Sequence, residues 1–246
     1  MRHSVVNLDT IKDVSRQEPV KIYRPCLVEY KPSDALGKGQ KVLVVCIGQN
    51  FMEGVADSIV AASNEYMRVN QAPCDIYVLQ SLTVLPPLGL GEMHNLAIMK
   101  AYLENYSHVM LIHNDVLLDD SQIIIKLMNR AKGFIVPLFK QVYREGPAEV
   151  IQWPMFNMDQ GLRELAWTVP YCVLYDMDIF RSGRVDVRCF TPTMLYNEDE
   201  INSVYMRCHG ITLWQDTDVK VKLLRGPGML CDTLEGLKLA KPFEMP

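Results

Sequence analysis

A cluster of polar residues follows an apolar run near the middle of the chain. His113, Asn114 and Asp115 come directly after the run HVMLI (108–112), and the sequence then becomes apolar again. Polar groups at the end of a buried strand lose their hydration unless a metal, a ligand or a turn uses them. On an extended chain His113 and Asp115 would point the same way, because side chains alternate with period two. The two side chains could therefore share one cation.

The elements that must position this cluster follow from the apolar pattern. Short continuous apolar runs are typical of strands buried on both faces. They predict four strands, at 41–48, 74–81, 107–115 and 134–139. Amphipathic segments between these runs predict three helices, at 50–67, 92–106 and 120–133. The alternation of strand and helix predicts parallel pairing, right-handed crossovers and helices on both faces of the sheet.

The second half of the chain is less regular. Its pattern predicts a strand within 167–180, a helix that starts at Asn197, and late strands within 211–224. Gly210 is expected to end the helix. The spacing of the helix predicts that four side chains face inward: Ile201, Val204, Tyr205 and Cys208.

Several polar segments fall at the carboxyl ends of the predicted strands or close to them. Besides 113–115, these are residues 48–50, 80–81 and 89–95. Ligands of open α/β sheets bind outside the carboxyl ends of the strands. We therefore expect the four segments to converge in space and to line one site.

The composition is that of an ordinary globular protein, with 49% hydrophobic and 22% charged residues. The formal net charge of −4 argues against nucleic-acid binding, so local cationic or backbone donors must hold any anionic ligand. Seven cysteines without a CxxC pair favour a reducing compartment. The sequence lacks a signal-peptide core and any apolar run of about 18 to 20 residues. We therefore expect a cytoplasmic protein with no transmembrane segment.

The order and spacing of several motifs over residues 41–224 resemble the GT-A fold of nucleotide-sugar glycosyltransferases. Family 2, the large inverting group, is the nearest match. The motifs that carry the resemblance are IGQN, GLGEMHNLAIMKA, LIHNDVLL, a NEDE helix closed by Gly210, and WQDTDVKV. The resemblance implies a three-layer α/β/α GT-A-like (Rossmann-like) fold with a mostly parallel central sheet.

The resemblance also implies roles for particular residues. In the segment like LIHNDV, the last acid of a DxD-type motif holds a divalent cation, and that position is Asp115, with His113 nearby as a second metal candidate. The segment like NEDE supplies the catalytic base, which implicates Asp199 with Glu198 beside it. Trp167 lies where relatives often place acceptor-binding residues, and it is expected either to bind the acceptor or to be a core tryptophan. The remaining candidates, all for nucleotide-sugar binding together with Asp115, are Ile47, Gly48, Asn50, His94, Asn95, Asn114 and Lys222.

The chemistry of glycosyl transfer suits these residue types. The leaving diphosphate needs its charge neutralised, usually by Mn²⁺ or Mg²⁺, which are cations that take oxygen ligands such as Asp115. A carboxylate within hydrogen-bond reach of the acceptor hydroxyl assists by about 10²- to 10⁴-fold. The implied partners are a nucleotide-diphosphate sugar donor and a glycan, lipid or protein acceptor. One hypothesis is that Lys220 or Lys222 takes over part of the cation's work, because a histidine that often completes the metal site is replaced here.

Other interpretations of the same motifs stay open. The acids of NEDE could only complement a helix N-terminus, and 113–115 could be a simple turn. A nucleotidyltransferase that makes a nucleotide sugar would share a similar sheet, although IGQNFMEG lacks the basic residues that hold a triphosphate. A third alternative is a catalytically inactive GT-A-like binding protein.

The chain is expected to divide into three parts. Residues 1–40 are an N-terminal extension, residues 41–224 form the GT-A-like domain, and residues 225–246 are a C-terminal tail.

Overall fold

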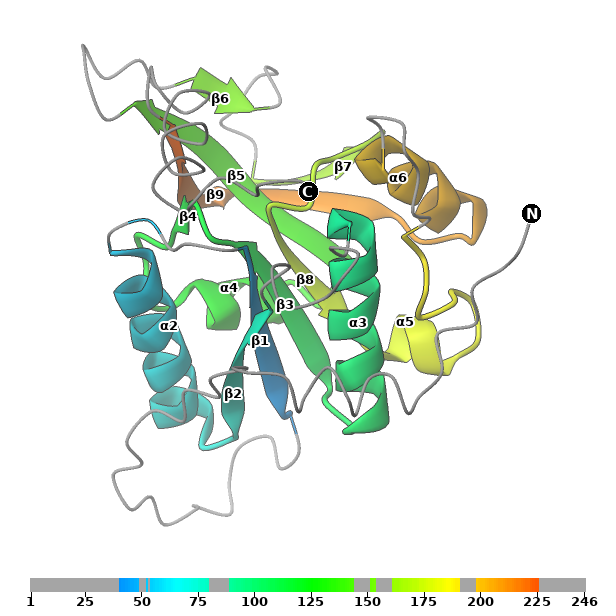
Figure 1. Cartoon of the computed structure of the whole chain (residues 1–246), viewed down its shortest axis with the longest axis horizontal. Coiled ribbons are helices and arrows are strands. Elements are labelled where there is room, and N and C mark those ends of the chain that lie inside the picture. The colour runs from blue at the N-terminus through cyan, green and yellow to red at the C-terminus, as the bar shows by residue number, and fades with distance from the viewer. Residues whose placement is uncertain are drawn as a thin grey trace, which may run out of the picture.

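A mixed β-sheet with helices packed against it forms the centre of the protein, as the computed structural model shows (Figure 1). The structure describes residues 40–48, 52, 54–79, 89–143, 151–153, 161–190 and 198–225. Its strands are β1 (Val42–Ile47), β2 (Cys74–Leu79), β3 (His108–His113), β4 (Val116–Leu117), β5 (Phe134–Tyr143), β6 (Ile151–Trp153), β7 (Leu162–Leu165), β8 (Cys172–Asp176) and β9 (Leu213–Arg225). Its helices are α2 (Val55–Asn70), α3 (Leu90–Leu103), α4 (Ile123–Asn129), α5 (Asp178–Arg181) and α6 (Glu198–Cys208). Nearly all of the predicted extension and tail lies outside the described residues, so that division stays a prediction.

The strand order is β2-β1-β3-β8-β5-β9-β4, with β6 paired to β5 and β7 paired to β9. The four predicted strands of the first half are confirmed as β1, β2, β3 and β5. β2, β1 and β3 are parallel neighbours, and so are β5 and β9. The predicted unbroken parallel succession is wrong at one place, because β8 is inserted between β3 and β5 and runs antiparallel to both. Five of the nine described strands, β1, β2, β3, β5 and β9, still run in the same direction, and the predicted α/β fold class is confirmed.

The core lies along the first three strands and the helices that cover them. All six residues of β1 are at most 1% exposed, which explains why its sequence is a continuous apolar run and not an alternating one. α3 contacts β3 and β1, and α2 contacts both β2 and α4. Figure 1 shows these helices flanking the strands. The register of these three strands places Ile47, Leu79 and His113 side by side at the carboxyl edge of the sheet.

α6 turns a largely polar side towards the protein, and the predicted inward face is wrong for three of its four residues. The fourth, Tyr205, is partly buried and packs against the core as predicted. Ile201 and Val204 are 38% and 52% exposed, and Cys208 is also exposed. Among the side chains of α6 that the structure describes, the buried ones are instead Asn202, Ser203 and Met206. The two polar ones donate hydrogen bonds to backbone carbonyl groups elsewhere in the chain, which offsets the cost of burying them.

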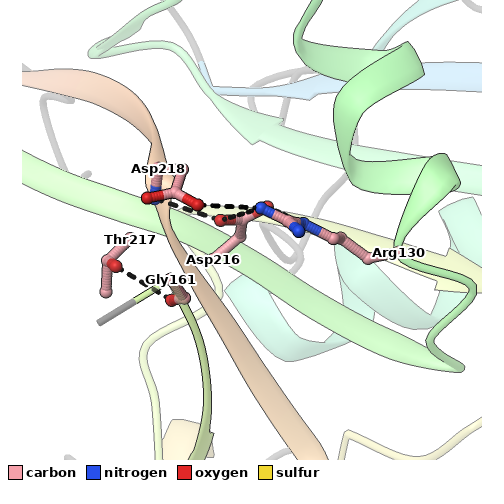
Figure 2. A network of polar contacts seen from close by, with 5 residues as sticks. All are labelled: Arg130, Gly161, Asp216, Thr217 and Asp218. Carbon is pink, nitrogen blue, oxygen red and sulfur yellow. Dashed lines mark hydrogen bonds and ion pairs between the residues drawn. The ribbon is translucent and has the colours of Figure 1, made fainter. Parts of the chain in front are cut away.

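β9 contains a bulge that an arginine holds (Figure 2). Pro137 of β5 lies opposite Asp216, but the next residue of β5 lies opposite Lys220, so residues 217–219 are extra. The guanidinium of Arg130 donates to the fully buried carboxylate of Asp216 (2.6 and 3.2 Å) and to Asp218 (3.0 Å). Thr217 donates from its N–H and its hydroxyl to the carbonyl of Gly161 (3.0 and 2.8 Å). The odd-numbered residues Gln215, Val219 and Val221 are buried on both sides of the bulge, so this network holds the extra residues while the same face of β9 stays buried.

Within the described part of the chain, no helix is both long and apolar enough to cross a membrane.

Candidate functional site

The loops that leave β1 and β3 meet at the carboxyl edge of the sheet. The chain turns one way from β1 to β2 and the other way to β3, so this edge contains a topological switch point, where open α/β sheets bind ligands. The N–H of Asn114 donates to the carbonyl of Ile47 (3.0 Å), and the N–H of Met52 donates to the carbonyl of Asn114 (3.1 Å). Gly48 has a φ of +143°, and a Cβ there would lie 2.3 Å from Cγ of Asn114. Three of the predicted donor-binding residues, Ile47, Gly48 and Asn114, are therefore in close contact.

Two histidine side chains are in contact at the carboxyl end of β3. Nε2 of His94, on α3, lies 3.2 Å from Nε2 of His113, at the end of β3. Burial, and then the neighbouring His113, lower the pKa of His94 well below its ordinary value. Nδ1 of His94 is buried and has no hydrogen-bond partner among the described residues. Since a neutral imidazole has one donor and one acceptor nitrogen, we assign the proton of His94 to Nε2, which then donates to His113.

Asp115 occupies a turn that joins β3 to β4. Its side chain is 6% exposed, and its carbonyl accepts a hydrogen bond from the N–H of Leu224 in β9 (2.8 Å). Burial raises the pKa of the Cys46 thiol, and the nearby carboxylate of Asp115 raises it further. Because 114 and 115 form a turn, the alternation that would align His113 with Asp115 does not apply.

The described side chains fit a cation that is held largely by its substrate. Among the residues that the structure describes, no three His, Cys, Asp or Glu side chains gather into a metal cluster. Nε2 of His113 already faces His94, so a metal at His113 would have to use Nδ1 or displace that contact. Mg²⁺ is commonly held by one or two carboxylates, water and the phosphates of the substrate. A single buried carboxylate at Asp115 agrees with such a site.

The predicted catalytic acids stand at the start of α6. Asp199 is half-buried, and its charge is one of the causes, after burial and Cys189, that raise the pKa of Tyr175. The hydroxyl of Tyr175 is buried without a hydrogen-bond partner in the described part of the protein. Glu198 begins the helix, but its side chain lies outside the described residues, as does the whole of Asn50.

Two residues that sequence reasoning missed connect α6 to the histidine pair. The amide of Asn202 donates to the carbonyl of Cys189 (3.3 Å). The ring of the following residue, Phe190, lies 4.5 Å from the ring of His94. Asn95 was expected at the nucleotide, and the structure places both polar ends of its side chain on the backbone of Phe190. No local pattern marks these contacts, because the partners are far apart in sequence.

The two remaining candidates, Lys222 and Trp167, lie in different places. Nζ of Lys222 is 3.0 Å from Oδ2 of Asp119, and Lys222 pairs with Leu117 of β4 just after Asp115. Trp167 is 42% exposed. The next residue, Thr168, donates its N–H to the hydroxyl of Ser203 (3.1 Å), which places Trp167 beside α6.

Comparison with known proteins finds a related fold and no close relative. No family model matches the chain, and no curated protein matches it. The structure is similar to the crystal structure of GalNAc-T7 with UDP, GalNAc and Mn²⁺, with a TM-score of 0.53 at 10% identity. The match covers 76% of this chain and 44% of GalNAc-T7, so the chain spans less than half of that protein. This likeness supports a GT-A-like fold.

Two weaker likenesses have lower scores. One is to A197 from STIV, with a TM-score of 0.38 at 9% identity, covering 75% of this chain and 94% of A197. The other is to a protein described as a candidate nucleotide-diphospho-sugar transferase from Desulfovibrio desulfuricans G20. Its TM-score is 0.40 at 11% identity, with 84% of this chain and 90% of that protein covered.

Proposed function

We propose that this protein is a glycosyltransferase that moves a sugar from a nucleotide-diphosphate sugar to an acceptor hydroxyl. The observation that carries the proposal is the position of Asp115, a buried carboxylate in the turn that follows β3, beside the switch point between β1 and β3. The GT-A-like fold and the UDP and Mn²⁺ bound by GalNAc-T7 are consistent with this proposal. The acceptor class, a glycan, a lipid or a protein, stays open.

The proposed donor half of the site uses the carboxyl edge of β1 and β3. Ile47, Gly48 and Asn114 would surround the nucleotide with backbone groups, and His94 would contribute from α3, whereas the side chain of Asn95 is bonded to Phe190. A bound Mn²⁺ or Mg²⁺ would neutralise charge on the leaving diphosphate, with Asp115 as its protein ligand and His113 as a second candidate. Lys222, beside Asp119, lies on the strand that pairs with β4 and would add positive charge there.

The proposed acceptor half lies at the start of α6. Asp199 would accept the proton of the acceptor hydroxyl, with Glu198 as the alternative base and Trp167 against the acceptor. The acceptor oxygen then forms a bond to the anomeric carbon as the bond from that carbon to the diphosphate oxygen breaks. The nucleoside diphosphate leaves with the electron pair, and direct displacement of this kind inverts the anomeric centre.

The test is a panel of nucleotide sugars incubated with the protein and Mn²⁺, with release of nucleoside diphosphate as the readout. We expect one donor to be turned over. Asp199→Asn should lower kcat by about 10²- to 10⁴-fold while UDP binding in Mn²⁺ is retained. Asp115→Ala should weaken that Mn²⁺-dependent UDP binding. Asp57→Asn, on the exposed side of α2, is the matched control and should change neither.

Each alternative gives a different result in the same panel. Unchanged release by Asp115→Ala would rule out the metal assignment. Binding of UDP without turnover of any donor would indicate an inactive GT-A-like binding protein. Release of pyrophosphate from a nucleoside triphosphate and a sugar phosphate would indicate a nucleotidyltransferase.

A further inference from the structure

Two buried asparagines hold the backbone of Cys189 and Phe190, and they come from two different helices. Asn95 lies on α3 and Asn202 lies on α6. Cys189 and Phe190 are 2% and 0% exposed, and we call this pair of residues the clasp. Its contacts reach both halves of the site proposed above.

Asn95 binds the clasp through both ends of its amide. Nδ2 of Asn95 donates to the carbonyl of Phe190 (2.6 Å), and the N–H of Phe190 donates to Oδ1 of Asn95 (2.9 Å). All of these groups are buried, so the bonds are shielded from competing water. A paired contact of this kind fixes both the distance and the orientation of Phe190 relative to α3.

Asn202 binds the clasp from the side of the proposed base. Nδ2 of Asn202 donates to the carbonyl of Cys189 (3.3 Å), and Asn202 is 2% exposed. Asp199 is three residues earlier on the same helix, and residues at this spacing lie on the same side of a helix. The bond therefore ties the turn of α6 that carries Asp199 to Cys189.

The clasp also touches the donor half of the site. The ring of Phe190 lies 4.5 Å from the ring of His94, and Nε2 of His94 lies 3.2 Å from Nε2 of His113. His113 is followed, after one residue, by Asp115. A continuous set of buried contacts thus runs from the first turns of α6, through the clasp and the histidine pair, to the end of β3.

We propose that Asn95 and Asn202 are positioning residues, and that the clasp sets the place of Asp199 relative to Asp115. The proposal rests on the proposed function, because the base must reach the acceptor hydroxyl while the diphosphate is bound at β3. A misplacement of about 1 Å can lower a rate by about 10²-fold. Asn95 then acts on the position of the base and makes no contact with the nucleotide that determines affinity.

The variants Asn95→Leu and Asn202→Leu test this role. Leucine keeps similar volume and adds no charge, but it cannot bond to Phe190 or Cys189. With the donor identified above, we expect kcat to fall by about 10- to 100-fold, while the Kd for UDP in Mn²⁺, measured by calorimetry, is unchanged. Asn202→Leu loses only one bond, so it remains informative if Asn95→Leu fails to fold.

The matched control is Asn70→Leu. Nδ2 of Asn70 also donates to a backbone carbonyl, that of Tyr66 (3.3 Å), but it does so at the C-terminal end of α2. This variant should retain full kcat. An equal loss of kcat in all three variants would overturn the positioning role, and so would a weaker Kd for UDP with kcat intact in Asn95→Leu.

Hydrogen exchange tests the clasp without any activity. In Asn95→Leu, the amide of Phe190 and the amides of α6 should exchange faster, while those of α2 and β2 keep their wild-type rates. Unchanged exchange in α6 would overturn the proposal, whatever the activity of the variant. If wild-type protein turns over no donor, the proposed function fails, and the positioning role falls with it while exchange still decides whether the clasp holds α6.

Discussion

The two sides of the sheet are held in place by different kinds of interaction. On one side β2, β1 and β3 share a continuous parallel register, and apolar side chains bury them. On the other side, around β9 and α6, polar side chains fix the backbone. Arg130 holds the bulge of β9, and Asn95 and Asn202 hold the clasp.

This difference matters because the proposed site would use both sides. Asp115 belongs to the apolar side and Asp199 to the polar side. Burial of apolar surface is not directional, so it stabilises a strand without fixing the exact place of one side chain. Hydrogen bonds and ion pairs are directional, and they occur here where the chain is irregular. Apolar burial stabilises both sides, since Val219 and Val221 of β9 are also buried, and we infer that the directional contacts around β9 and α6 supply the geometry of the irregular side.

The largest effect is expected from a cavity in the apolar side. Leu111 of β3 is 0% exposed, and Leu111→Ala removes buried methyl groups from the centre of the core. We expect the free energy of unfolding, measured in urea, to fall by about 3 to 5 kcal/mol. A loss below about 1 kcal/mol would contradict the claim that apolar burial dominates this side.

The next largest effect is expected at Arg130. Arg130→Ala leaves the carboxylate of Asp216, which is 0% exposed, without its cation. We expect a loss of about 3 kcal/mol, at the low end of the range for a broken buried pair, because Arg130 itself is 36% exposed. The double variant Arg130→Met with Asp216→Leu should recover much of this loss, since it leaves no buried charge.

The control for this prediction is Arg68→Ala. Arg68 pairs with Glu65 on the surface of α2 (2.7 Å) and its side chain is 63% exposed. Urea unfolding of this variant should be close to that of the wild type. Equal losses for Arg68→Ala and Arg130→Ala would show that the bulge network is no more important than a surface ion pair.

The same difference explains how much of the fold could be predicted from the sequence. The run VLVVCI of β1 could be predicted as a strand, because a strand buried on both faces needs apolar residues at every position. The bonds from Arg130 to Asp216 and from Asn95 to Phe190 join residues 86 and 95 positions apart. Such partners leave no local period, so neither the bulge of β9 nor the clasp could be found. The antiparallel position of β8 between β3 and β5 could not be predicted for the same reason.

Within the candidate site, the part at β1 and β3 could be predicted from the sequence and the part at α6 could not. The convergence of Gly48 and Asn114 could be predicted, since both follow parallel neighbouring strands. The inward face of α6 could not, because Asn202 and Ser203 are buried by their bonds to Cys189 and Thr168. Apolar periodicity then selected the exposed Ile201 and Val204. The roles of Asp115 and Asp199 stay predictions.

A pH dependence of stability is expected where the two sides meet, at His94. The unfolded chain takes up a proton at this imidazole below about pH 6.5, whereas the folded protein keeps it neutral because burial, and then His113, lower its pKa. Stability is therefore fully present above this pH and falls as the pH falls, by up to about 1.4 kcal/mol per pH unit. Urea unfolding between pH 7 and pH 5 should show a shallower dependence in His94→Leu. The exposed His209 gives the control His209→Leu, which should keep the wild-type slope.

The smallest effect is expected on the outer face of α6, and it sharpens the comparison. Val204 is 52% exposed, whereas Met206, two residues further on, is 0% exposed. We expect Val204→Ser to change the free energy of unfolding by no more than about 0.5 kcal/mol, and Met206→Ala to lower it by about 2 to 5 kcal/mol. The reverse order would mean that apolar periodicity identified the buried face of α6 after all. It would also remove the polar anchoring of this helix, because Asn202 and Ser203 could not then face the clasp and Thr168.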